Sequence, residues 1–161
     1  MRALALILLL GCGGGGALDP DVVTHLPDGD GAGKVASGVY AIGLYTSGCQ
    51  GRCSYGDSQS VCDIGQRHSG SLVITQTGGH LRIEPEGSEL ALTRLDGGIW
   101  KDGRFDVGGL ATQLGGSVVI TARAGGTLAG TLTGHAQARA QGKVGGDELD
   151  CIASFDLTGS P

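Results

Sequence analysis

The sequence predicts an all-β protein in which eight antiparallel strands form an up-and-down meander that closes into a barrel. Glycine is unusually frequent, at 33 of 161 residues. Since each interior glycine costs a helix roughly 1 kcal/mol relative to alanine, long helices are disfavoured and tight turns are favoured. Apolar and polar residues alternate in most segments after residue 37, which is typical of half-buried strands. Closure into a barrel removes exposed strand edges. A two-sheet sandwich is the main alternative.

The overall composition limits the classes of function. The net charge is −5 and 17% of residues are charged, with no basic run, so we expect no binding to nucleic acid. The hydrophobic fraction of 40% argues against disorder. The length fits one domain. We expect a monomer that needs no cofactor.

The N-terminus has the pattern of an export signal. Met1-Arg2 precedes eight apolar residues, 3–10, which are too few to span a bilayer, and Gly11-Cys12 follows. Leu9-Leu10-Gly11-Cys12 resembles the lipobox of bacterial lipoproteins. The resemblance implies that residues 1–11 are removed, that Cys12 is acylated and that the lipid anchors the protein in the cell envelope. Gly13, where an Asp would favour the inner membrane, implies the outer membrane. The alternatives are an ordinary cleaved signal or a buried N-terminal strand.

Residues 12–37 read as a flexible tether rich in Gly, Asp and Pro. As a random coil, the tether would hold a single β domain, 38–161, on the order of 25–30 Å from the lipid. Residues 29–34 weakly resemble a phosphate loop and residues 28–33 a calcium loop. Both lack essential positions, because Val35 replaces the Ser or Thr of the first and Val39 the final Glu of the second. We therefore interpret both as acidic linker and predict no metal site.

Eight segments fit the strand pattern. Turns are expected at Gly78-Gly79, Asp102-Gly103 and Gly125-Gly126, because paired glycines and Asp-Gly favour two-residue hairpins. A bend is expected at 96–98, inside the fourth strand. The predicted strands cover 39–46, 71–77, 80–84, 89–101, 104–110, 117–123, 127–139 and 149–158.

This pattern resembles lipocalin-like and avidin-like barrels in architecture. Gly38-Val39-Tyr40 resembles the Gly-x-Trp start of a lipocalin, with Tyr40 in the place of the Trp. The resemblance implies an interior that is either filled by side chains or just able to hold a small ligand.

Four cysteines remain after Cys12, and an even number in an exported domain predicts two disulfides. In a closed meander the end of the first strand lies near the start of the last strand. We therefore favour Cys49–Cys151 with Cys53–Cys62 among the three possible connectivities. The alternative is a zinc site formed by Cys49, Cys53, Cys62 and His68, but these spacings lack a Cys-x₂-Cys pair.

We find no motif that places a nucleophile next to a base, so we do not expect an enzyme. Asp63, His68 and Ser69 are close in sequence, which is no evidence for a catalytic triad. The loop 48–70 is long and cysteine-rich, and Tyr55, Arg67 and His68 within it are the first candidates for binding. The alternative is a stapled plug without a ligand.

Three functional hypotheses follow. The first is a lipid-anchored envelope protein that binds a small apolar molecule or a partner protein, with Tyr40, Trp100, Phe105 and Phe155 as possible pocket aromatics. Core filling is the simpler role for each of these residues. The second is a structural or interaction protein with a filled barrel, and the third is a hydrolase. An interior cavity above roughly 300 Å³ with apolar walls would favour ligand binding over a filled barrel.

Overall fold

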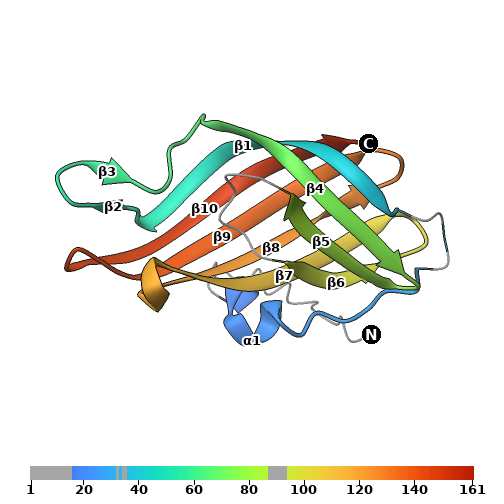
Figure 1. The fold of residues 1–161 in the computed structure, drawn as a ribbon, viewed down its shortest axis with the longest axis horizontal. Helices are drawn as coiled ribbons and strands as arrows, with labels where there is room; N and C mark the ends of the chain where they lie inside the picture. Colours follow the sequence, from blue (N-terminus) through green and yellow to red (C-terminus); the bar gives the residue numbers. More distant parts are fainter. Residues whose placement is uncertain (1–15, 32, 34–35, 87–93) are drawn as a thin grey trace, which may run out of the picture.

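The protein is a closed eight-stranded antiparallel barrel, seen in a computed structural model that describes residues 16–31, 33, 36–86 and 94–161 (Figure 1). This confirms the predicted fold class and the barrel over the sandwich. A separate two-stranded hairpin lies between the first two barrel strands. The barrel strands are β1 (Gly38–Arg52), β4 (Arg67–Thr77), β5 (His80–Glu86), β6 (Leu95–Ile99), β7 (Arg104–Gln113), β8 (Val118–Leu128), β9 (Leu132–Val144) and β10 (Asp147–Ser160), and the hairpin strands are β2 (Ser54–Tyr55) and β3 (Gln59–Ser60).

The topology is the predicted up-and-down meander. Each barrel strand pairs antiparallel with the next one along the chain, and β1 pairs with both β4 and β10, which closes the barrel. This arrangement is consistent with a lipocalin-like fold. No helix in the described part of the chain is long and apolar enough to span a membrane.

The turn predictions are confirmed at two places and wrong at one. Gly78, at φ +61°, and Gly103, at φ +85°, occupy the expected turns. Gly125 and Gly126, by contrast, lie inside β8, and the chain turns at 129–131, which divides the predicted strand 127–139. A Cβ on Gly126 would lie 2.1 Å from the carbonyl oxygen of Thr133. Gly126 is therefore needed for close contact between β8 and β9. The turn is formed instead around Gly130, at φ +84°.

The first strand is longer than predicted, and this changes the disulfide pairing. A bulge shifts the β1–β10 register between Thr46 and Gly48, so that Cys49 lies opposite Ala153 and Gly51 opposite Cys151. Cys49 is therefore two positions away from Cys151 along the ladder.

Two disulfides are present, as predicted, but the favoured connectivity is wrong. The bonds are Cys49–Cys62 and Cys53–Cys151, because Cys53 follows the end of β1 beside Cys151. All four thiols are used, so the alternative zinc site has no cysteine ligands.

The segment preceding the barrel is packed on its outer wall, and we refer to residues 16–31 as the strap. The strap contains a 3₁₀ turn, η1 (Gly16–Leu18), and a short helix, α1 (Pro20–Val23), which lies against β7 and β8 (Figure 1). Leu18 and Val23 are completely buried. The prediction of a flexible tether is therefore wrong for residues 16–31, while Cys12 and the signal residues 1–11 lie outside the described residues.

Glycines on the barrel wall and hydrogen bonds explain why the strap docks. A Cβ on Gly108 would lie 2.7 Å from the carbonyl oxygen of Val23, so only a residue without a side chain admits the strap there. The backbone N–H of Gly29 donates to the Gly79 carbonyl at 2.9 Å, and the Asp30 carboxylate accepts from the backbone of Lys101 at 2.7 Å. The acidic residues and glycines that resemble a linker in the sequence thus form hydrogen bonds and close backbone contacts with the barrel.

Candidate ligand-binding cavity

The barrel interior is divided into a packed part and an open part. Large side chains fill the part near the β4–β5 and β6–β7 turns, where Phe105, Leu81 and Ile74 have at most 1% of their surface exposed. The other part, toward the disulfides, contains a cavity of about 510 Å³. This volume exceeds roughly 300 Å³, the size above which we expect a barrel to bind a ligand and not to be filled by side chains.

Small residues on β8 and β9, together with Ala153 on β10, create the space. Their inward-facing positions carry alanine where the packed part has large aliphatic or aromatic side chains, because alternate residues of a strand face the interior. Ala138 and Ala153 lie directly opposite each other in the ladder. Leucine, isoleucine and phenylalanine side chains of other strands complete an apolar wall. The alanines that line the cavity include Ala122, Ala124, Ala136, Ala138, Ala140 and Ala153.

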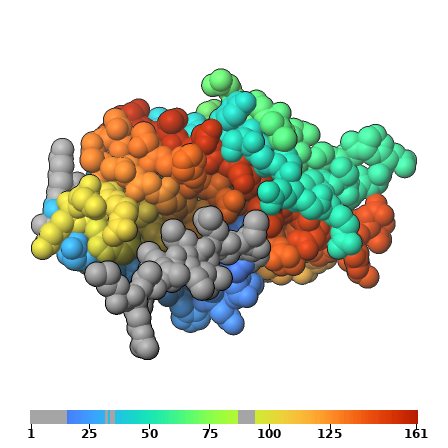
Figure 2. Space-filling model, turned by 180° about the vertical axis from the view of Figure 1, so that it is seen from behind, coloured from blue at the N-terminus to red at the C-terminus, as the bar shows by residue number. Residues whose placement is uncertain are grey.

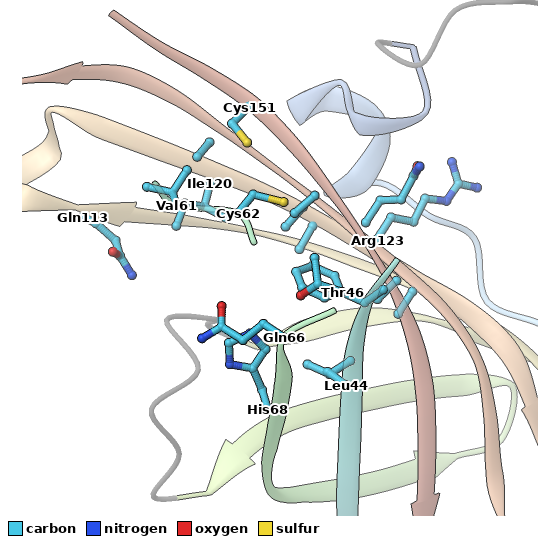
Figure 3. Close-up of a pocket in the computed structure, with 18 of the residues that line it drawn as sticks. Leu44, Thr46, Val61, Cys62, Gln66, His68, Gln113, Ile120, Arg123 and Cys151 are labelled. Atoms are coloured by element: carbon cyan, nitrogen blue, oxygen red, sulfur yellow. The ribbon is translucent and has the colours of Figure 1, made fainter. Parts of the chain in front are cut away.

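Most of the polar residues of the cavity lie at its mouth, which we define as Tyr55, Val61, Asp63, Gln66, His68, Gln113 and Leu114. Figure 3 shows the side chains of Gln66 and His68 close together, with Gln113 across the opening. Val61 and Leu114 are 45% and 64% exposed, which makes part of this rim apolar as well as accessible. An apolar chamber with a mixed rim suits an amphiphilic molecule.

The disulfides and backbone hydrogen bonds fix the loop that forms one side of the mouth. Cys62 and Cys151, one from each disulfide, line the cavity. The backbone of Thr46 donates to the Gln66 carbonyl at 2.9 Å and accepts from Gly65 at 2.8 Å. The β2–β3 hairpin projects beyond the barrel next to the β9–β10 turn (Figure 2), where the Gly56 backbone donates to Asp147 at 2.8 Å. The loop predicted at 48–70 is therefore shorter, because β1 and β4 extend into it.

Two of the five predicted binding residues line the cavity. Tyr55 comes from the hairpin, and His68 lies in β4 rather than in a loop. The His68 ring packs edge-on against Phe155, with 6.5 Å between the ring centroids. Ser69 is exposed and adjacent strand residues face opposite sides, so the sequence neighbours His68 and Ser69 are separated by the barrel wall.

The other three predicted residues lie elsewhere. Tyr40 is buried in the packed part and donates a hydrogen bond to the Ala36 carbonyl at 3.1 Å. Arg67 lies over the ring of Tyr45, at 5.5 Å from its centroid. Trp100 lies at the β6–β7 turn beneath the guanidinium of Arg104. Of the two phenylalanines, Phe155 lines the cavity and Phe105 fills the core.

Sequence reasoning missed several mouth residues. Leu114 precedes two glycines in a turn, and an exposed leucine in such a position is a signal that could have indicated the rim. Gln66 and Gln113 carry no comparable signal, because a polar residue near a strand end is ordinary.

Several charged side chains of the barrel form ion pairs on its outer surface. Arg123 borders the cavity through its strand, but its guanidinium points away from the interior (Figure 3) and binds Asp106 at 2.7 Å. Hydrogen bonding to Asp106 raises the pKa of Arg123 further, against the effect of partial burial. Arg139 and Asp150 form a similar outer pair at 2.8 Å. Among the described residues that line the cavity, no arginine or lysine therefore places its charge inside the barrel.

The chain matches no known protein family and no curated protein sequence. The geometry of the cavity therefore carries the functional argument.

Proposed function

We propose that this protein is a lipid-anchored protein of the bacterial cell envelope that holds a small apolar ligand inside its barrel. The observation that carries the binding proposal is the cavity of about 510 Å³ with apolar walls and an accessible mouth. Ligand pockets of this kind commonly measure about 300–1,000 Å³. A protein with a purely structural role would gain stability by filling this space, since each unfilled methyl-sized void costs about 1 kcal/mol.

Titration with the fluorescent apolar probe N-phenyl-1-naphthylamine tests the binding proposal. We expect saturable binding by the wild-type protein and a loss of binding in Ala138→Phe, where the new ring occupies the cavity. Ala41→Phe is the matched control, because Ala41 is exposed on the outside of β1 and does not border the cavity. Equal binding by both variants, or no binding by the wild type, would contradict the proposal.

The anchoring proposal depends on the lipobox-like Leu9-Leu10-Gly11-Cys12. Expression of the full chain in a bacterial host should give a fatty-acid adduct at Cys12, detectable by mass spectrometry, and Cys12→Ser should abolish it. Several acyl chains would hold the protein at a membrane firmly, at about 0.8 kcal/mol per buried methylene. An unmodified wild-type protein with its signal intact would refute this part while leaving the binding proposal standing.

A further inference from the structure

We infer that the ligand of this cavity is an amphiphile with an uncharged, hydrogen-bonding headgroup, and that a carboxylate of the same chain length is excluded. The inference rests on the proposed binding function and specifies the chemical class of the ligand. It follows from the hydrogen-bonding groups at the mouth and from the lack of an available positive charge among the described lining residues.

The first step is the absence of an available cation. Among the described residues that line the cavity, Arg123 is the one arginine or lysine. Its Nη2 and Nε atoms bind the two carboxylate oxygens of Asp106 at 2.7 and 2.9 Å, and its Nη1 donates to the Ala17 carbonyl at 3.3 Å. These bonds hold the guanidinium on the outer face, between the wall and the strap. It is therefore not free to pair with an anion inside the barrel.

The second step is the cost of an unpaired anion. A carboxylate moved out of water needs a cation or several hydrogen-bond donors to offset its lost hydration. The lining carboxylate of Asp63 would repel a second carboxylate at the same opening, because like charges at close range disfavour ionisation. An anionic headgroup is thus opposed from both sides.

The third step explains why a cationic headgroup is not favoured either. Asp63 is the one carboxylate among the described lining residues, and its side chain is exposed. An ion pair at an exposed site contributes less than about 1 kcal/mol. The mouth therefore offers little to offset the dehydration of an ammonium group.

The fourth step concerns the groups that remain. Thr46, buried to 1% exposure, lines the cavity, and Gln66 and His68 lie beside it at the mouth (Figure 3). A hydroxyl and an amide each both donate and accept hydrogen bonds, and the imidazole does both in its neutral form. This mixture matches a hydroxyl or ester headgroup, which also donates or accepts without carrying charge.

Displacement of N-phenyl-1-naphthylamine by three compounds with one chain length tests the inference. We expect dodecanol to displace the probe at least ~10-fold more effectively than dodecanoate or dodecyltrimethylammonium. Equal or stronger displacement by either charged compound would overturn the inference while leaving the proposed function intact. A failure of the probe to bind at all would remove both.

A charge introduced at the mouth should change the preference. In Gln66→Lys we expect the affinity for dodecanoate to rise by about 2- to 5-fold, with the affinity for dodecanol little changed, because the ammonium supplies the missing partner at an exposed position. Thr112→Lys adds the same charge at an exposed position that does not border the cavity. An equal gain for dodecanoate in Thr112→Lys would overturn the inference, since the net charge of the surface would then set the selectivity.

Discussion

The two ends of the barrel are stabilised in different ways. The packed end is filled by residues such as Phe105 and Leu81, and residues 27–31 of the strap lie on its outside, whereas the open end has alanine walls and a cavity. Both disulfides lie at the open end, where they join the hairpin loop to β1 and β10. The comparison indicates that crosslinks replace core packing where the interior must stay empty. It also places the cavity at the end whose shape depends least on side-chain packing.

The largest expected effect is the loss of the long-range disulfide at the open end. Cys53–Cys151 joins residues 98 apart, while Cys49–Cys62 joins residues 13 apart. Chain-entropy estimates give about 4.7 kcal/mol for a loop of that longer kind and about 3 kcal/mol for the shorter. We expect the double variant Cys53→Ala/Cys151→Ala to lower the free energy of unfolding by more than Cys49→Ala/Cys62→Ala does, as measured by urea denaturation. The reverse ranking would mean that the shorter bond supports the open end.

The next largest effect is expected from the loss of a phenylalanine side chain at the packed end, compared with the same change at the open end. Phe105 is 1% exposed in the packed end, so Phe105→Ala should cost about 3–5 kcal/mol through the cavity it leaves. Phe155 already faces the cavity and is only partly buried, so Phe155→Ala should cost less than about 2 kcal/mol. Thermal unfolding of both variants measures the difference. Equal losses would show that the open end is packed as tightly as the other.

A substitution beneath the strap tests whether this segment is docked on the barrel wall. Gly108→Ala would place a Cβ 2.7 Å from the Val23 carbonyl oxygen, and we expect a loss of about 1–2 kcal/mol together with faster proteolysis within residues 16–31. Gly43→Ala is the control, because its Cβ would meet Thr158 Oγ1 at 3.4 Å, an ordinary contact. Similar losses in the two variants would argue against a docked strap in solution.

The smallest expected effect is a pH dependence where the strap meets the wall. The His80 ring lies 2.7 Å from Asp28 of the strap and 3.0 Å from Asp96 of β6. The hydrogen bond to Asp28 raises the pKa of His80, partial burial opposes this rise, and the hydrogen bond to Asp96 adds a smaller rise. Since the folded-state pKa lies above 6.5, this stabilisation is full below that pH and is lost as the pH rises through the raised value.

We expect His80→Gln to reduce the difference in the free energy of unfolding between about pH 5.5 and about pH 8.5, measured by urea denaturation, by less than about 1 kcal/mol for such exposed pairs. Asp96 does not contribute in this window. Burial raises the pKa of Asp96, but hydrogen bonds from His80, Arg82 and Arg94 outweigh it and lower the pKa, so its contribution disappears only in acid. An unchanged pH profile in His80→Gln would exclude the histidine as the cause.

The candidate site could be predicted only in part. Tyr55 and His68 follow from the unusual cysteine-rich loop, because long stapled loops are commonly functional. Tyr40 and Trp100 could not be excluded as binding residues from the sequence. The same strand pattern is expected for an aromatic residue whether it faces the filled or the empty part of the interior. The cavity itself depends on which alanines of β8, β9 and β10 face each other, and the pairing of Ala138 with Ala122 and Ala153 is a property of the register.

The strand periodicity and the four cysteines that follow Cys12 determined the all-β class, the meander and the two disulfides, because those features depend on local patterns. Tertiary structure decided the rest. The bulge between Thr46 and Gly48 moves the register and so chooses the cysteine partners. The strap docks because glycines far away in the chain leave room for it, as Gly108 does for Val23. Such long-range contacts do not change the periodicity of the sequence segments that form them, so they are seen only in the folded chain.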